Sequence, residues 1–379
     1  MTASPVDQPP VIRQEKLPAV ETIDEVAPGV LRLQLPIALP GLAHVNCYAI
    51  EDREGFTLVD PGLPGKPSWL ALSDRLKRAG IALTHVHSVV VTHSHPDHFG
   101  NAGRVAEEAG AQVITHCAFQ LMYEPFHVCH LPDCDDILHS HADVGQEALP
   151  AADELQRFGM KNPWSGFVWD PSDNEPTLRQ HGTAFLAENG WPYLQPGRRM
   201  RHGDPIKVGN RDWFAVHTPG HTLDHLCLYD PETGTLLSGD HILPTITPHI
   251  SGIATGRDAL GSFFDSLDRC AALPGISTAL PAHGGVISNV GERVHEIKEH
   301  HAERLRVLAR VSQAVGETDV TEYSHYLFRQ ERWGSMAESE TYAHLQHLVA
   351  SGHAVRRNDD NGVARYTVSD LGTDEIKAN

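Results

Sequence analysis

The most constraining feature of the sequence is the run THSHPDH at residues 92–98, which places three imidazoles and a carboxylate within six residues. Alternate side chains of an extended chain point to the same side, so we expect His93, His95 and Asp97 to face a common point at the end of a strand. The proline marks a turn that re-aims Asp97 and His98. Imidazole and carboxylate groups gathered in this way predict a metal site, and the four groups diverge enough to serve two neighbouring ions.

Strands and helices are predicted to alternate on both sides of this run. A helix is expected from Pro67 to Gly80, with Leu70, Leu72 and Leu76 toward the core, and another over residues 99–109. The predicted strands cover residues 30–35, 44–51, 56–60, 85–91, 112–116, 205–208, 212–217, 225–229, 235–239 and 279–282. This order predicts an α/β fold in which helices cover a sheet, with a second sheet formed by the later strands.

The chain of 379 residues is long enough for two domains and an embellishment. We expect a disordered arm over residues 1–20, a domain that carries the motif over 21–290, and a C-terminal domain over 291–379. Residues 117–203 are rich in proline, aspartate and aromatic residues, and the segment is too long for a plain loop. We therefore predict that it forms an inserted helical cover.

The C-terminal domain is predicted to resemble a winged helix, because helical segments over 296–315, 320–328 and 338–351 precede a two-stranded hairpin at 354–368. Winged helices often bind nucleic acid, but the charge argues otherwise. Residues 296–379 contain 14 acidic against 10 basic residues, and residues 338–351 contain no Lys or Arg. With a formal charge of −19 for the whole chain, we favour a packing or dimerisation role over nucleic-acid contact, and a homodimer is left open.

The remaining composition bears on compartment. The six cysteines form no CxxC pair, the first ten residues have no leader pattern, and no apolar stretch is long enough to cross a bilayer. We therefore expect free thiols in a reducing compartment and a soluble, cytoplasmic protein without membrane contact.

One short motif cannot complete the coordination of two ions, and further candidate ligands follow later predicted strands. They are His221 in HTPGH (217–221), Asp240 in SGDH (238–241) and His283 in PAHGG (281–285). Each is weak alone, because a lone polar residue at a strand end is more often a satisfied polar group than a ligand.

In this order the four motifs, preceded by LVDPG at 58–62, resemble the metal motifs of the metallo-β-lactamase superfamily over about residues 30–285. The resemblance implies an αββα four-layer sandwich with a dinuclear site at the sheet edges. It implies that one ion is held by His93, His95 and His221, the other by Asp97, His98 and His283, with Asp240 bridging them and Asp60 hydrogen-bonding a ligand or nearby loop. An aspartate rather than a cysteine at the bridging position resembles the glyoxalase II, lactonase and nuclease branches, and the winged-helix tail resembles the lactamase-β-like endoribonuclease branch.

Such ligands suit Zn²⁺, with Mn²⁺ or Fe²⁺ as alternatives. We expect a metal-dependent hydrolase in which a hydroxide bridging the two ions attacks a small ester, thioester or lactone. Asp97 would orient the hydroxide and help to protonate the leaving group, and His241 would either donate a proton to the substrate or pack beside the site. The alternatives are a single-strand endoribonuclease or phosphodiesterase, an iron-dependent sulfur dioxygenase, and a non-catalytic DNA-binding regulator.

Overall fold

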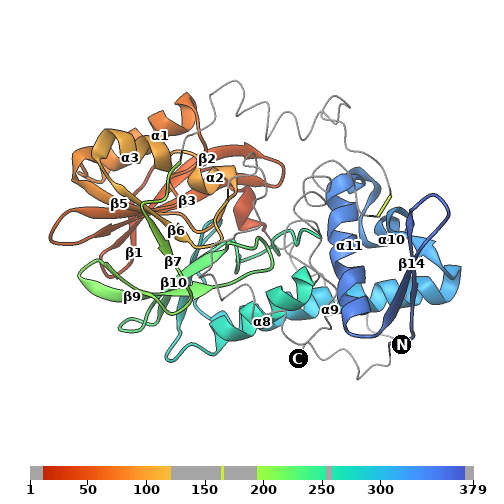
Figure 1. The fold of residues 1–379 in the computed structure, drawn as a ribbon. Coiled ribbons are helices and arrows are strands. Elements are labelled where there is room, and N and C mark those ends of the chain that lie inside the picture. Colours follow the sequence, from red (N-terminus) through yellow and green to blue (C-terminus); the bar gives the residue numbers. More distant parts are fainter. Residues whose placement is uncertain (1–11, 121–163, 166–193, 253–257, 372–379) are drawn as a thin grey trace, which may run out of the picture.

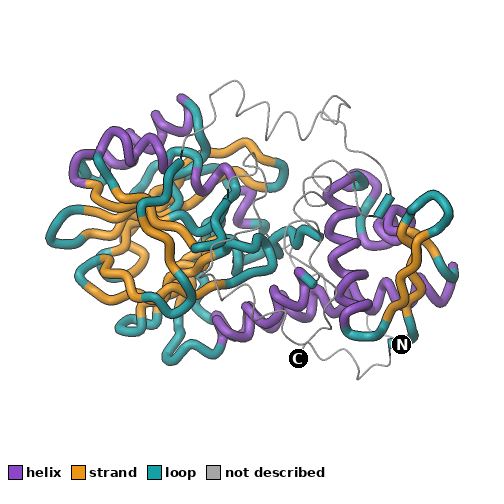
Figure 2. Tube along the Cα trace, in the orientation of Figure 1, coloured by secondary structure: helices purple, strands orange, loops and turns teal. Residues whose placement is uncertain are grey.

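The computed structural model describes residues 12–120, 164–165, 194–252 and 258–371. Two β-sheets are stacked face to face with helices on their outer sides, and a third, small sheet lies with the C-terminal helices (Figures 1 and 2). Most of the predicted cover over residues 117–203 lies outside the described residues.

The first sheet has seven strands in the order β1 to β7. Their bounds are β1 (Asp24–Ala27), β2 (Val30–Leu39), β3 (Leu42–Glu51), β4 (Phe56–Val59), β5 (Val86–Val90), β6 (Gln112–His116) and β7 (Arg198–Met200). The first four strands pair antiparallel, and β4 to β7 pair parallel. Because the carboxyl ends of parallel strands meet at one edge, loops after β4, β5 and β6 are brought together there. Strand β7 lies within the segment for which only helices were expected.

Helices α1 (Lys66–Arg78) and α3 (Ala102–Ala109) cover the outer face of this sheet (Figure 1). The core side of α1 contains Trp69, Leu72 and Leu76, which are buried at helical spacing. The prediction for Leu70 is wrong, because its side chain is 57% exposed and Trp69 takes the inward position.

The second sheet has five strands in the order β12-β11-β10-β9-β8. They are β8 (Pro205–Val208), β9 (Arg211–His217), β10 (Leu226–Asp230), β11 (Thr235–Gly239) and β12 (Thr278–Pro281), antiparallel except for β11 with β12. Helix α8 (Ala259–Ala271) covers its outer face, and the Asp258 carboxylate caps this helix by accepting a hydrogen bond from Gly261 N at 2.7 Å. The sequence analysis did not anticipate α8, although Leu260, Phe263 and Leu267 have helical spacing.

Between the sheets lies a core that draws side chains from both, including Tyr48 and Ile50 of β3 and Trp213 of β9. Separate apolar clusters lie under α1 and α3 and under α8. The layers are therefore helix, sheet, sheet and helix (Figure 1), which confirms the αββα sandwich that the resemblance implied.

Helices and a small sheet form the C-terminal part. Its elements are α9 (Val290–Val315), β13 (Thr318–Asp319), α10 (Val320–Leu327), α11 (Ser335–Ala350), β14 (Ala354–Asn358) and β15 (Ala364–Val368). The sheet order is β13-β15-β14, so the expected hairpin has a third, short strand. Buried residues of α11 include Tyr342, His344 and Leu345. The division of the chain into domains stays a prediction.

Short helices complete the description: η1 (Gln14–Lys16), η2 (Leu83–His85), α2 (Pro96–Phe99) and η5 (Gln330–Arg332). The disordered arm expected over residues 1–20 does not extend over η1. There Glu15 is buried, because its carboxylate accepts hydrogen bonds from Thr245 N at 2.8 Å and Ile246 N at 3.2 Å.

The cysteines correct one expectation. Cys47, Cys227 and Cys270 are free and buried, but Cys117 is joined in a disulfide, so the expectation of free thiols is wrong there. Cytoplasmic placement stays a prediction. Within the described part of the chain, no helix combines the length and apolar character needed to span a membrane.

Candidate metal centre

The motif loop carries its side chains from the end of β5 into α2. His93 and His95 lie in the loop, and Pro96 occupies the first turn of α2, where its fixed φ favours helix initiation. Asp97 and His98 therefore project from a short helix at the place where a turn was expected. Of the helix expected over 99–109, α3 covers residues 102–109, and residue 99 is the last of α2.

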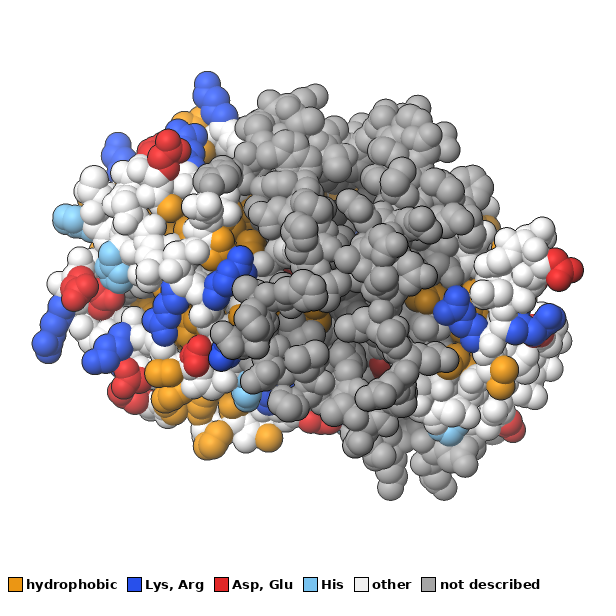
Figure 3. Space-filling view, in the orientation of Figure 1, with side chains coloured by type: hydrophobic (Ala, Val, Ile, Leu, Met, Phe, Trp, Pro, Cys, Tyr) orange, Lys and Arg blue, Asp and Glu red, His pale blue; other side chains and the backbone are white. Residues whose placement is uncertain are grey.

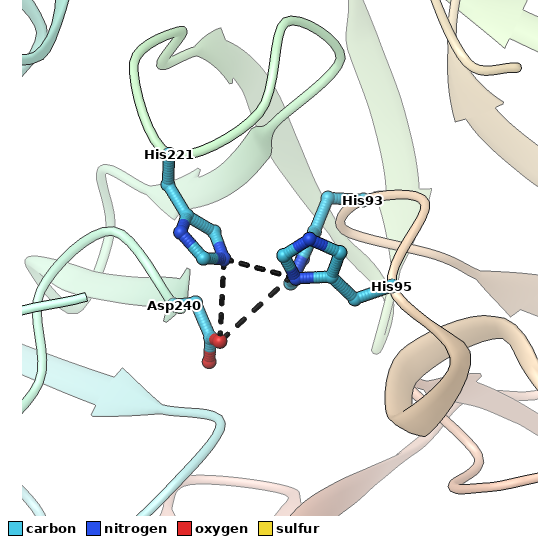
Figure 4. A group of neighbouring side chains, drawn as sticks. All are labelled: His93, His95, His221 and Asp240. Atoms are coloured by element: carbon cyan, nitrogen blue, oxygen red, sulfur yellow. Dashed lines mark hydrogen bonds and ion pairs between the residues drawn. The ribbon is translucent and has the colours of Figure 1, made fainter. Parts of the chain in front are cut away.

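Four side chains form the first cluster: His93, His95, His221 and Asp240 (Figure 4). The Nδ1 atom of His95 lies 3.0 Å from His93 Nε2 and 3.1 Å from His221 Nε2. Asp240 Oδ2 lies 3.6 Å from His221 Nε2 and 4.0 Å from His93 Nε2. Ligand atoms around a tetrahedral ion with bonds of about 2.0–2.1 Å are roughly 3.3–3.5 Å apart, so this spacing fits one metal ion.

The second cluster consists of Asp97, His98 and His283. Asp97 Oδ2 lies 3.6 Å from His98 Nε2 and 3.5 Å from His283 Nε2. Asp240 reaches this cluster too, with Oδ1 at 3.2 Å from His283 Nε2 and Oδ2 at 3.6 Å from His98 Nε2. The Asp240 carboxylate thus lies between the two clusters, the place of a bridging ligand.

Polar atoms left without hydrogen bonds provide a test of whether cations fit here. His98 Nε2, His283 Nε2 and Asp240 Oδ1 are buried and have no hydrogen-bond partner of acceptable geometry among the described residues. An unsatisfied buried polar atom costs about 1–3 kcal/mol, so three of them around one point favour an additional ligand. The donor set of imidazoles and carboxylates therefore fits two divalent ions.

The pKa values of the ligand histidines differ between the two clusters. Burial and the neighbouring imidazoles hold the pKa of His93 and of His95 well below its usual range, so both rings are neutral and offer a lone pair. Burial alone would also lower the pKa of His98, but Asp97, Asp240 and Asp60 raise it well above its ordinary value. The carboxylates thus attract a proton to the second cluster, and a bound cation would take that role.

Each of four ligand histidines has its other ring nitrogen in a hydrogen bond. These pairs are His93 Nδ1 with Thr92 Oγ1 (3.0 Å), His98 Nδ1 with Asp60 Oδ2 (2.8 Å), His221 Nδ1 with the His249 carbonyl (2.7 Å) and His283 Nδ1 with the His44 carbonyl (2.6 Å). Partners of this kind fix the tautomer and the ring orientation of a metal-binding histidine. For all four, the Nε2 lone pair is turned toward the site.

Asp60 connects the end of β4 to the motif loop. Its Oδ1 accepts a hydrogen bond from Thr92 N at 2.8 Å, and its Oδ2 accepts from Thr92 Oγ1 at 2.7 Å as well as from His98. The residue has φ of 54°, a left-handed conformation that aspartate tolerates better than most residues. This backbone turn directs the carboxylate beneath the motif loop.

His225 has a structural role that the sequence analysis did not assign. Its Nε2 accepts a hydrogen bond from Asp240 N at 3.1 Å, and its Nδ1 donates to Thr218 Oγ1 at 2.7 Å. Gly239 permits this approach, because it has φ of 51° and a Cβ there would lie 2.7 Å from His225 Nε2. His225 thereby fixes the main chain at the bridging aspartate.

The side chain of His241, for which a proton-donor role was considered, packs beside Phe263, and the proton-donor role stays a prediction. The side chain is fully buried, and its ring centroid lies 5.0 Å from that of Phe263. Burial lowers the pKa of His241 to about 3, so the ring is neutral at physiological pH. Of the two roles left open by the sequence, this geometry favours packing beside the site.

Comparison with known proteins shows where these features recur. The family model for the metallo-beta-lactamase superfamily matches residues 40–283. The lactamase-like protein nscB of Arthroderma benhamiae is 24% identical over 300 residues, and the match covers 78% of this chain and 49% of the relative. The lactamase-like protein vrtG of Penicillium aethiopicum is 25% identical, with 77% and 68% covered. The chain thus spans about half the length of the first of these relatives.

Two crystal structures match nearly the whole chain. A metallo-beta-lactamase family protein from Thermus thermophilus is 28% identical with a TM-score of 0.67, covering 91% of this chain and 100% of that one. A beta-lactamase domain protein from Burkholderia ambifaria is 26% identical with a TM-score of 0.68, covering 94% and 97%.

Proposed function

Because the chain belongs to the metallo-β-lactamase superfamily, we propose that it is a hydrolase that holds two divalent metal ions, preferably Zn²⁺, and cleaves a small ester, thioester or lactone. The observation that carries this proposal is the gathering of seven side chains into two adjacent clusters, with Asp240 between them. His93, His95 and His221 would hold one ion, and Asp97, His98 and His283 the other.

Two ions at these positions would supply an activated water as nucleophile, the bridging hydroxide of the sequence-based expectation, and would polarise the carbonyl under attack. The chain's own groups determine the charge there. Asp97 and Asp240 contribute two negative charges against four positive ones, so the loaded site keeps a positive charge that stabilises a developing oxyanion.

Asp97 is the group we assign to proton transfer. It is 4% exposed, and its Oδ2 lies among the ligand nitrogens of the second cluster. A carboxylate in this position can orient the nucleophile and then return a proton to the leaving group. Replacing Asp97 by Asn is expected to reduce turnover by about 10²-fold or more in protein that still binds metal. Full turnover with both ions retained would contradict this assignment.

A small-molecule substrate is favoured over nucleic acid by the C-terminal helices. Helix α11, which would enter a groove in a winged-helix protein, buries Tyr342, His344 and Leu345 and contains neither Lys nor Arg. On the described part of the face in Figure 3, basic and acidic side chains are interspersed rather than gathered by sign. Nucleic-acid binding relies on a concentrated basic surface.

The experiment is elemental analysis of protein purified without added metal, combined with a screen of lactones, thioesters, phosphodiesters and RNA. We expect two zinc ions per chain and hydrolysis of an ester-like substrate that stops when the metal is removed. One iron per chain with oxygen consumption would replace the proposal by a dioxygenase. Salt-sensitive binding and cleavage of single-stranded RNA would replace it by a nuclease.

A further inference from the structure

We infer that Glu340 of α11, paired with Arg304 of α9, is a positioning residue for the metal ligand His221, acting through the segment 249–252. This inference rests on the proposed two-metal site. It assigns a role in that site to helices that lie beyond residues 40–283, the part matched by the family model.

A continuous series of contacts connects the helices to the ligand. The Nδ1 atom of His221 donates a hydrogen bond to the main-chain carbonyl of His249 at 2.7 Å. The ring of His249 in turn donates from Nδ1 to Glu340 Oε2 at 3.3 Å. Arg304 Nη1 donates to the other carboxylate oxygen, Glu340 Oε1, at 2.5 Å. The orientation of the His221 ring therefore depends on where the His249 main chain lies.

Glu340 is a fixed anchor for this series. Its side chain is buried, and burial opposes ionisation, but Arg304 and the hydrogen bond from His249 lower its pKa below the ordinary value. The carboxylate is thus charged at neutral pH. A charged, buried carboxylate with two directional partners has little freedom to move, because charge-assisted hydrogen bonds are short and strong.

The segment after His249 lies against the same helix. Ile250 is fully buried in the core, and Gly252 N donates to Ser339 Oγ at 3.3 Å. A Cβ at Gly252 would lie 2.5 Å from Tyr342 Cδ1 and 2.9 Å from Ser339 O, so the main chain approaches α11 as closely as a glycine allows. Residues 249–252 are therefore held at both ends, and their carbonyls cannot shift without loss of contacts on α11.

His221 is distinct among the ligand histidines whose outer partners are described. The partners of His93, His98 and His283 belong to Thr92, Asp60 and His44, which lie in strands of the first sheet or within two residues of a strand's end. A disturbance at Glu340 should thus lower the affinity of the first cluster for its ion and leave the affinity of the second cluster unchanged.

The test compares Glu340→Gln with Glu338→Gln. Glu338 lies on the same helix and accepts hydrogen bonds from Trp164 Nε1 at 3.0 Å and Thr321 Oγ1 at 2.9 Å, so its variant disturbs α11 without touching His249. Metal affinities are measured by chelator competition, and the visible spectrum of the Co²⁺-loaded protein reports ligand geometry. For Glu340→Gln we expect one of the two affinities to fall about tenfold or more, with a changed Co²⁺ spectrum, whereas Glu338→Gln resembles the wild type.

A second variant, His249→Ala, removes the ring that links the segment to Glu340 but keeps the carbonyl and the Glu340–Arg304 pair. It is expected to show the same selective loss, and it serves if Glu340→Gln fails to fold. Two affinities within about twofold of the wild type in a folded variant would overturn the inference and leave the proposed function intact. If the wild-type chain bound no divalent metal, both this inference and the proposed function would be contradicted.

Discussion

The hydrogen bonds of Asp60 make Asp60→Asn a strong perturbation despite its small size. The carboxylate accepts from Thr92 N on one oxygen and from Thr92 Oγ1 and His98 Nδ1 on the other. An amide has only one accepting oxygen, so in either orientation its NH₂ group faces a main-chain N–H or the proton on His98 Nδ1. When the NH₂ group faces His98, the two donors stop opposing each other only if the His98 proton moves from Nδ1 to Nε2. That proton would occupy the Nε2 lone pair that binds the metal. Asparagine also tolerates the left-handed backbone here, so backbone strain adds little.

The expected magnitude follows from this conflict. Loss of the partner that orients a metal-binding histidine lowers metal affinity about 10- to 100-fold, or roughly 1.4–2.7 kcal/mol. The loss should fall on the ion of the second cluster, because His98 belongs to it. An unpaired buried donor should lower the free energy of unfolding of the metal-free protein by about a further 1–3 kcal/mol.

Chelator competition gives the two affinities, and urea unfolding of the metal-free protein gives the stability. The matched control is Asp52→Asn, which removes a carboxylate that pairs with His87 at 3.0 Å on another part of the first sheet. Asp52→Asn should keep both affinities. If Asp60→Asn bound both ions as tightly as the wild type, the argument that Asp60 fixes the tautomer of His98 would be refuted.

Three further predictions test other parts of the structure. Gly239→Ala is expected to lower the free energy of unfolding by about 1–2 kcal/mol because of the left-handed φ, and by more because the new Cβ would contact His225. It should also lower the metal content. Thermal unfolding measures the first effect and elemental analysis the second. Burial, reinforced by Arg304, lowers the pKa of His344 from 6.5 to about 3, so the unfolded chain binds a proton there that the folded chain does not. The contribution of this group to the free energy of unfolding is complete above about pH 6.5 and is lost as the pH falls toward 3. Urea titrations at several pH values give that free energy. In this range it should rise with pH less steeply for His344→Gln than for the wild type, by up to about 1.4 kcal/mol per pH unit. Removal of the metal by a chelator should abolish hydrolysis and lower the unfolding temperature. At a free metal concentration about 100-fold above the Kd of a site, binding at that site stabilises the folded chain by about 2.7 kcal/mol. An unchanged melting curve would argue against tight binding.

Local patterns made much of the fold predictable. Strand β6 at residues 112–116 and strand β11 at 235–239 have the predicted bounds, because short apolar runs ended by polar or glycine residues mark buried strands. In α1 the predicted core residues Leu72 and Leu76 are buried, but Trp69 rather than Leu70 takes the third core position. Residue 69, unlike residue 70, stands three residues before Leu72 and seven before Leu76, so helical spacing already favours it for the core face.

The candidate site also has one part that the sequence predicts, the metal ligands, and one part that it does not, their hydrogen-bond partners. Histidine and aspartate in a dense run can be recognised from sequence, because few structures need such a density of ligand groups. The partners that orient them leave no such signal. His225 looked like an ordinary strand residue, and the acceptors for His221 and His283 are main-chain carbonyls of His249 and His44, which any residue type supplies.

A main-chain acceptor has a consequence for mutagenesis. Substitution at position 44 or 249 leaves the carbonyl itself in place, so a side-chain scan cannot remove the group that holds the ligand. The scan detects this group only where, as expected for His249→Ala, the lost side chain frees the main chain to move. Its contribution becomes visible only when the main chain itself is allowed to move, through the contacts that hold it from outside. For His249 those contacts lie on α11, at Glu340 and Ser339, which is why residues remote in sequence from every motif should affect the affinity for one ion.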